Sequence, residues 1–256
     1  MLSKYKFITY IIVFFVTIVF ITNAFCKNSQ DNESISQSSG FIIDERGYIV
    51  TANDFIDKLS SIEVVYNSFV YEAKIIANDA TAGLALLKIE FRGFDRGAFP
   101  VLLMDDSQLH PCDSIRIVSC SIVGEIKKGW FSNIIRGISN SVNQGNIYSI
   151  NEESLLLSAT VNLGSGGSPI INNNGRVIGM LKSQNSERVV EGIPVNRLMS
   201  FLDKSCIAPS CGYKVSNDAD VNIDLVMKAT VFIKATTKYQ DAYLPNPCAI
   251  PGVCGK

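Results

Sequence analysis

Residues 159–180 constrain the fold of this chain more than any other stretch of it. They include a loop at 164–169 (GSGGSP), in which three glycines within four positions allow a sharp turn and let consecutive N–H groups point to one spot. Two short apolar runs follow, and the turn between them ends in Asn174 and Gly175, which readily adopt the φ > 0 conformation of a tight hairpin. The stretch therefore predicts a glycine-rich loop that leads directly into a β-hairpin.

Short segments with the composition of strands recur along the rest of the chain. A second hairpin is expected at 41–51, where an apolar triplet and a β-branched run flank a turn that ends in Gly47. Its order of residues matches the hairpin at 170–180, which suggests a duplicated architecture. Many short strands between turns predict an all-β barrel or sandwich. Further strands are expected at 62–71, 72–77, 84–89, 113–120, 129–140, 146–149 and 154–161, and a helix around 194–202.

Composition excludes several classes of function. The chain of 256 residues has a net charge of −1 and a pI near 5.9, so there is no electrostatic case for a nucleic-acid partner. No nucleotide-binding motif is present, because the glycines at 164–167 precede a hairpin rather than a helix. The single histidine, His110, leaves no convincing set of metal ligands. We therefore expect no cofactor and no metal.

The first 26 residues have the pattern of an export signal. Lys4 and Lys6 precede an apolar run at 7–21, and residues 24–26 form an acceptable cleavage site. The run is short for a membrane span, which favours a cleaved signal peptide and a periplasmic or secreted protein. The alternative is a membrane anchor at 7–21. Residues 27–39 are polar and are expected to form a flexible linker.

Removal of Cys26 from the seven cysteines leaves six, an even number that suggests disulfides in an exported protein. Cys112 and Cys120 bracket an expected strand that would hold their Cα atoms roughly 26 Å apart, so they should not pair with each other. The other four lie close enough in sequence to pair locally, Cys206 with Cys211 and Cys248 with Cys254. Alternatively, Cys120 is a buried free thiol.

Residues 205–256 form a cysteine- and proline-containing C-terminal extension. A short helix is expected at 220–228 and a strand at 229–235 (ATVFIKA). We expect this strand to dock on the barrel beside residues 41–50.

Three segments resemble the HtrA-type members of the trypsin-like serine proteases. They are residues 38–54 (SSGFIIDERGYIVTAND), residues 77–90 (ANDATAGLALLKIE), and residues 160–180 with 191–203 behind them. The segments occur in the family's order. The resemblance implies two antiparallel six-stranded β-barrels at 40–204, with an active-site cleft between them and a closing helix.

The catalytic triad of that family is not retained. The histidine that ends the T-x-N-H motif is Asp54 here, the aspartate before the L-A-L-L segment is Gly83, and an ungapped match places Gly166 at the nucleophile. A serine is a weak nucleophile until a neighbouring base takes its proton, and a carboxylate with a pKa near 4 cannot replace that histidine. A shift of one residue would make Ser165 the nucleophile. His110 lies in a turn that matches the region between the barrels and is not expected to act as the base.

The resemblance and the substitutions together predict an exported pseudoprotease that binds an extended peptide or protein without cutting it. Trypsin-like proteases bind substrates as an added β-strand, a mode that needs only main-chain groups and pockets. The N–H groups of Gly164, Ser165 and Gly166 could still form an oxyanion-like nest. The alternatives are a divergent serine endopeptidase that uses Ser165 or Ser168, with Asp54 as the base, and a structural envelope protein.

Overall fold

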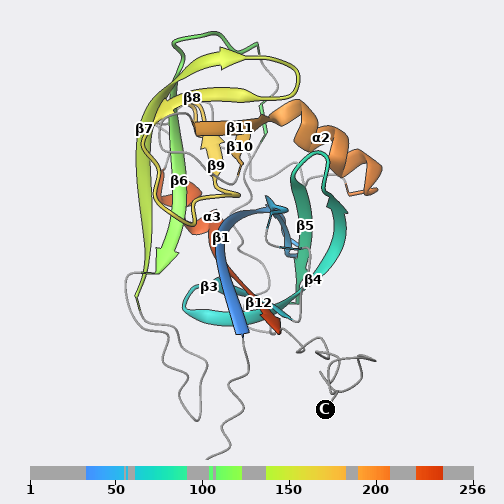
Figure 1. The fold of residues 1–256 in the computed structure, drawn as a ribbon. Helices are drawn as coiled ribbons and strands as arrows, with labels where there is room; N and C mark the ends of the chain where they lie inside the picture. Colours follow the sequence, from blue (N-terminus) through green and yellow to red (C-terminus); the bar gives the residue numbers. More distant parts are fainter. Residues whose placement is uncertain are drawn as a thin grey trace, which may run out of the picture. The chain divides into compact units, whose positions relative to one another are not determined.

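Two closed antiparallel β-barrels, each of six strands, make up most of the fold (Figure 1). The computed structural model describes residues 33–54, 56, 61–90, 104–105, 108–122, 137–182, 190–207 and 223–238. Residues 34–237 form one unit that holds both barrels; of the second unit, Met1–Glu33 and Lys238–Lys256, the structure describes Glu33 and Lys238. The expected signal at 1–26 and the cysteines at 211, 248 and 254 lie outside the described residues.

The first barrel combines the N-terminal strands with the last strand of the chain, in the order β1-β12-β3-β4-β5-β2. Its apolar runs are inward-facing, as expected for β-branched and leucine-rich segments. The hairpin predicted at 41–51 is formed by β1 and β2, and Gly47 has the positive φ (92°) that its turn requires. The strands are β1 (Glu33–Asp44), β2 (Tyr48–Ala52), β3 (Ser61–Tyr66), β4 (Phe69–Asp79), β5 (Leu84–Ile89) and β12 (Thr230–Lys238).

The second barrel has the order β10-β11-β8-β7-β6-β9. The hairpin predicted from Asn174 and Gly175 is formed by β9 and β10, and Asn172 Oδ1 stabilises its turn by accepting the N–H groups of Asn174 (2.9 Å) and Arg176 (3.0 Å). The strands are β6 (Ser114–Ile122), β7 (Ile138–Ile150), β8 (Leu155–Ala159), β9 (Pro169–Ile171), β10 (Val177–Leu181) and β11 (Val190–Pro194). Both barrels confirm the trypsin-like fold class.

Two helices follow the second barrel in the described part of the chain. Helix α2 (Val195–Lys204) begins after Pro194, as predicted, and buries Val195, Leu198, Phe201 and Leu202. Leu198 and Leu202 belong to an apolar cluster that also contains Phe41 of β1 and Met180 of β10, so this cluster joins the two barrels. Helix α3 (Ile223–Ala229) leads into β12.

The expected linker at 27–39 is wrong for residues 33–39, which form the first half of β1. Their polar composition is typical of a linker, but Ser38 and Ser39 are buried and hydrogen-bonded to the second barrel. The predicted position of the tail strand is correct: β12 lies between β1 and β3 and pairs with β3 from Phe232↔Val65 to Thr236↔Ser61.

Two predicted strand boundaries are also corrected. The break expected between residues 71 and 72 lies at Asn67 and Ser68, whose positive φ values (48° and 67°) form the turn between β3 and β4. The segments expected as separate strands at 129–140 and 146–149 contribute to one strand, β7, from Ile138 onward. Gly145 lets β8 approach β7 closely, because a Cβ there would lie 2.6 Å from the Cβ of Ala159 on β8.

The described cysteines, Cys112, Cys120 and Cys206, are free thiols. Cys112 and Cys120 are therefore not paired with each other, as predicted. Cys120 is buried, and this burial raises the pKa of its thiol to about 12, which agrees with the alternative of a buried free thiol. Within the described ranges, no helix has both the length and the apolar character needed to span a bilayer.

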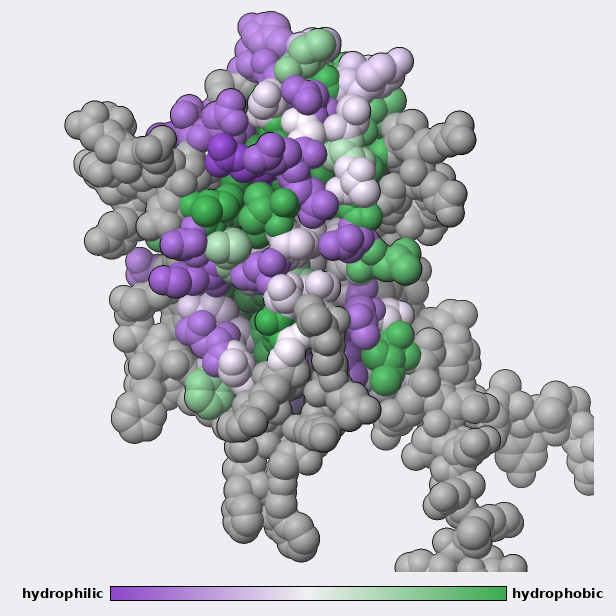
Figure 2. All heavy atoms as spheres, turned by 90° about the vertical axis from the view of Figure 1, so that its left-hand side faces the viewer, coloured by the Kyte–Doolittle hydropathy of each residue, from purple (hydrophilic) through white to green (hydrophobic). Residues whose placement is uncertain are grey.

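Large apolar side chains that are exposed on the described surface come from several elements. Figure 2 shows the side of the molecule on which β7 lies in Figure 1, with hydrophobic groups separated by hydrophilic ones. Two of the exposed apolar residues, Ile35 and Leu163, belong to the segments that meet where the two barrels join. The complete set is Ile35, Phe69, Ile75, Ile76, Val142, Tyr148 and Leu163.

Candidate functional site at the barrel junction

The glycine loop connects β8 to β9 and is held by backbone hydrogen bonds. The N–H of Ser165 donates to the carbonyl of Asn162 (3.2 Å), and the N–H of Ser168 donates to that of Ser165 (3.0 Å). Gly167 and Ser168 then pair with Leu181 of β10 through two bonds of 2.8 Å. Gly164 and Gly167 both have φ of +81°, so the loop uses the conformational freedom of glycine at two places.

The first barrel fixes the loop from the other side. The carbonyl of Gly166 accepts two hydrogen bonds from β1, from the N–H of Ser39 (2.8 Å) and from Ser38 Oγ (2.7 Å). At Gly167 a Cβ would lie 2.1 Å from the carbonyl oxygen of Ser39 and 2.6 Å from Thr51 Oγ1, so only glycine fits there without displacing backbone. The loop is thus packed directly against β1 and β2.

The fold brings together the three segments that carry the triad positions. The N–H of Asn53 donates to the carbonyl of Gly83 (3.0 Å), which joins the end of β2 to the start of β5. The N–H of Ala52, on the same segment, is 2.9 Å from the Cβ position at Gly167. Asp54, Gly83 and Gly166 therefore belong to one junction, and the side chain of Asp54 is exposed there.

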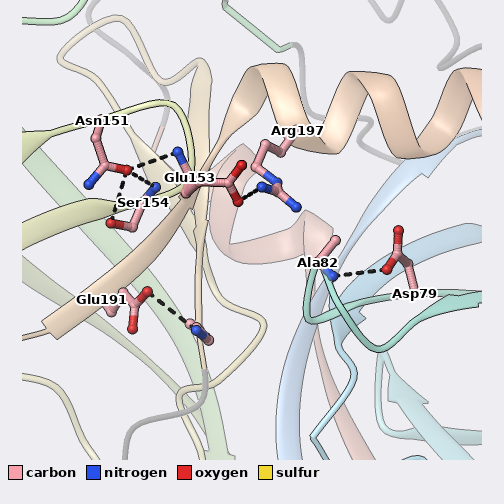
Figure 3. Close-up of polar contacts among 8 residues, drawn as sticks. Asp79, Ala82, Asn151, Glu153, Ser154, Glu191 and Arg197 are labelled. Atoms are coloured by element: carbon pink, nitrogen blue, oxygen red, sulfur yellow. Dashed lines mark hydrogen bonds and ion pairs between the residues drawn. The ribbon is translucent and has the colours of Figure 1, made fainter.

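The backbone at Gly83 differs from that of an ordinary residue. Its φ is +73°, in the left-handed region that disfavours side chains with a Cβ. The preceding turn is stabilised by Asp79, whose Oδ1 accepts the N–H of Ala82 at 2.9 Å (Figure 3). The position that would orient a catalytic histidine therefore has no carboxylate.

Figure 3 also shows how the adjoining part of the second barrel is held. Glu153, in the turn between β7 and β8, forms an ion pair with Arg197 of α2. Glu191 of β11 pairs with Lys182 at 3.3 Å. Surface pairs of this kind contribute little stability; the first joins α2 to the turn between β7 and β8, and the second joins β11 to the residue that follows β10.

Ser165 and Ser168, the two serines considered as alternative nucleophiles, are buried in this arrangement. Ser165 is 3% exposed and Ser168 is fully buried, and neither Oγ has a hydrogen-bond partner among the residues that the structure describes. A catalytic serine must reach the substrate and must lie within hydrogen-bond distance of its base. The third buried oxygen without a partner near the junction is Oδ1 of Asn53, which is an acceptor and not a base.

Two N–H groups of the loop have no acceptor among the described residues. Those of Gly164 and Gly166 donate to no other described residue, whereas that of Ser165 is engaged by Asn162. Leu163, which precedes Gly164, is 96% exposed. The expected nest of Gly164, Ser165 and Gly166 thus has two available donors in this structure.

The family model for the trypsin-like peptidase domain matches residues 38–180 of the chain. The chain belongs to the trypsin-like peptidase family. Relatives of this peptidase-family chain include the "Serine protease Do-like HtrA" of Bacillus subtilis, 27% identical over 172 residues that cover 65% of this chain and 37% of that protein. Another is the "Probable periplasmic serine endoprotease DegP-like" of Chlamydia muridarum, 27% identical over 146 residues, 56% of this chain and 27% of that protein.

A vertebrate relative of the same family is "Serine protease HTRA1" of Xenopus tropicalis. It is 27% identical over 181 residues, which cover 69% of this chain and 38% of that protein. The chain therefore spans about a third of the length of the relatives that it matches.

Other candidate residues of this peptidase-family chain lie elsewhere. His110 is exposed in the turn before β6, where its N–H donates to Asp113 Oδ2 at 2.8 Å. In the described part of the chain, no group of three or more histidine, cysteine, aspartate or glutamate residues is arranged to hold a metal ion.

Sequence reasoning missed Ser38 and Ser39, the two residues that attach the glycine loop to the first barrel. Both precede the Gly-Phe-Ile-Ile run that begins the hairpin of β1 and β2. The available signal was their place at the start of the segment that resembles the protease family. The polar residues that precede them led us to assign both serines to the expected linker instead.

Proposed function

We propose that this chain is an exported, catalytically silent member of the trypsin-like peptidase family that binds an extended peptide or protein segment. One observation carries the proposal: the junction that unites the triad segments holds Asp54, Gly83 and Gly166, which do not supply a nucleophile and its base. Acyl transfer by a serine needs both groups, and in the triad a third group orients the base.

The geometry of the remaining serines supports the absence of catalysis. Ser165 and Ser168 are buried, and within the described part of the chain neither hydroxyl is hydrogen-bonded to a base that could raise its nucleophilicity. Gly83 has no side chain, so it supplies no carboxylate that could act as the third group.

The main-chain groups of the loop support peptide binding. The free N–H groups of Gly164 and Gly166 can donate to a carbonyl oxygen of an extended chain. The exposed side chain of Leu163 is available for apolar contact beside them. Binding of this kind needs no hydroxyl at position 166, so it is compatible with loss of the nucleophile.

Export is supported by the signal pattern of residues 1–26 and by the periplasmic location named for a relative. Intact mass measurement on protein recovered from an expressing cell tests this part. A mass that corresponds to a chain beginning near residue 27 supports a cleaved signal. A full-length, membrane-associated chain supports the anchor at 7–21 instead.

The test of catalysis is reaction of the mature protein with a fluorophosphonate probe, which labels serines activated beside an oxyanion hole. We expect no labelling of the wild type, shown to be folded by circular dichroism, or of Ser165→Ala and Ser168→Ala. Labelling that disappears in one of the two variants would overturn the proposal and establish a divergent serine hydrolase.

The test of binding is fluorescence anisotropy with a library of labelled extended peptides, followed by mass spectrometry of the peptides. We expect binding at micromolar concentration or better, with every peptide intact. Gly164→Ala should weaken binding, because an alanine disfavours the φ of +81° that aims this N–H. Gly175→Ala, strained in the same way in the turn of β9 and β10, is the matched control and should bind normally.

A further inference from the structure

We infer that the C-terminal strand β12 positions the glycine loop indirectly, by packing against the residues that hold Ser39 of β1. Ile233 and Phe232 of β12 are then positioning residues for the peptide site. The inference rests on the proposed function for its binding readout. It concerns a strand that comes after the second barrel in sequence yet completes the first barrel.

The first contact joins β12 to the strand that holds the loop. Ile233 is fully buried in the apolar core of the first barrel, and a Cβ at Gly40 of β1 would lie 2.7 Å from its Cδ1. This side chain therefore packs against the backbone of the residue directly after Ser39. Closely packed interiors transmit such contacts, because they have little free volume in which to relax.

The second contact joins β12 to the second barrel. Phe232 forms a buried cluster with Val65 of β3 and Cys120 of β6. The N–H of Cys120 donates to Ser39 Oγ at 3.1 Å, and its carbonyl accepts the Ser39 hydroxyl at 3.2 Å. Phe232 thus packs against the residue that fixes the side chain of Ser39.

Ser39 connects these two contacts to the glycine loop through its hydrogen bonds. Its N–H donates to the carbonyl of Gly166 at 2.8 Å, and its hydroxyl is 3.4 Å from the carbonyl of Gly164. Both carbonyls belong to the residues whose N–H groups are the proposed donors to the peptide. A displacement of Ser39 therefore shifts the backbone of the two residues that carry the donors.

The register of β12 against β3 is well defined. Lys234 pairs with Glu63 of β3 at 2.9 Å, and both side chains are largely shielded from solvent. This pair and the ladder to β3 fix Phe232 and Ile233 along the strand. The tail strand consequently has a specific position behind Ser39, which a change in its side chains can perturb.

The experiment compares two equal deletions of a methyl group from the same core. Ile233→Val removes the Cδ1 that packs against Gly40. Ile89→Val is the matched control, because Ile89 is also fully buried in that cluster but lies at the end of β5. The readouts are peptide affinity by anisotropy and hydrogen exchange, by mass spectrometry, of the fragment covering residues 160–170. Urea unfolding confirms that the two variants have similar stability.

We expect Ile233→Val to weaken peptide binding by about two- to thirtyfold, the range given by coupling energies through packed side chains. Exchange in residues 160–170 should become faster in Ile233→Val and stay at the wild-type rate in Ile89→Val. Equal exchange and equal affinity in the two variants would overturn the inference. If the wild type binds no peptide, the proposed function fails, and the exchange comparison alone then decides whether β12 positions the loop.

Discussion

The replacement of Gly167 by alanine tests the packing of the loop against the first barrel. The new Cβ would lie 2.1 Å from the carbonyl oxygen of Ser39, 2.6 Å from Thr51 Oγ1 and 2.9 Å from the nitrogen of Ala52. None of these distances is tolerable, and two of the three atoms are backbone. The loop must therefore move away from β1.

The cost of Gly167→Ala has two parts. The φ of +81° costs a residue with a Cβ about 1–2 kcal/mol. Movement of the loop also breaks the two hydrogen bonds to the Gly166 carbonyl, from Ser38 Oγ and the Ser39 N–H, at about 1 kcal/mol each. The sum is about 3–4 kcal/mol, which corresponds to a fall in Tm of about 6–16 °C for a domain of this size.

The assay is urea unfolding, with Gly83→Ala as the matched control. Gly83 has a similar φ of +73°, but a Cβ there would meet only Ile193 Cδ1, at an ordinary 3.5 Å. We expect the control to lose about 1–2 kcal/mol from its backbone alone. Equal losses in the two variants would show that the steric contact with β1 is absent, and would refute the close packing of the loop on the first barrel.

Three further predictions concern single groups. Cys120 should resist thiol reagents at pH 8 until the protein unfolds. Burial raises the pKa of its thiol to about 12, above the value in the unfolded chain, so its contribution to the free energy of unfolding should fall as pH rises from about 8.5 to 12 in urea titrations. Lys234→Ala should cost about 1–2 kcal/mol of unfolding free energy and the more exposed Lys182→Ala less than about 1, by the same titration. Ser165→Ala and Ser168→Ala remove hydroxyls without partners, so calorimetry should find Tm unchanged or raised.

The sequence determined the local elements and the chemical content of the site. Both family-like hairpins were predicted from the residues of their turns, and Gly47 and Gly175 have the expected φ > 0, whereas Asn174 does not. The apolar period of α2 likewise identified the closing helix. The identities of Asp54, Gly83 and Gly166 are facts of the sequence, and the match to the family model agrees with the fold that the three family-like segments imply.

Only the tertiary structure decided how distant segments complete one another. Residues 33–39 look like a linker because their serines are polar, and they form a strand because Ser38 and Ser39 find partners on the second barrel. The burial of Ser165 and Ser168 likewise depends on β1 and β10, and so it cannot be read from the loop. Composition reports what a residue can bond to, whereas closure of the barrels determines which of those bonds are formed.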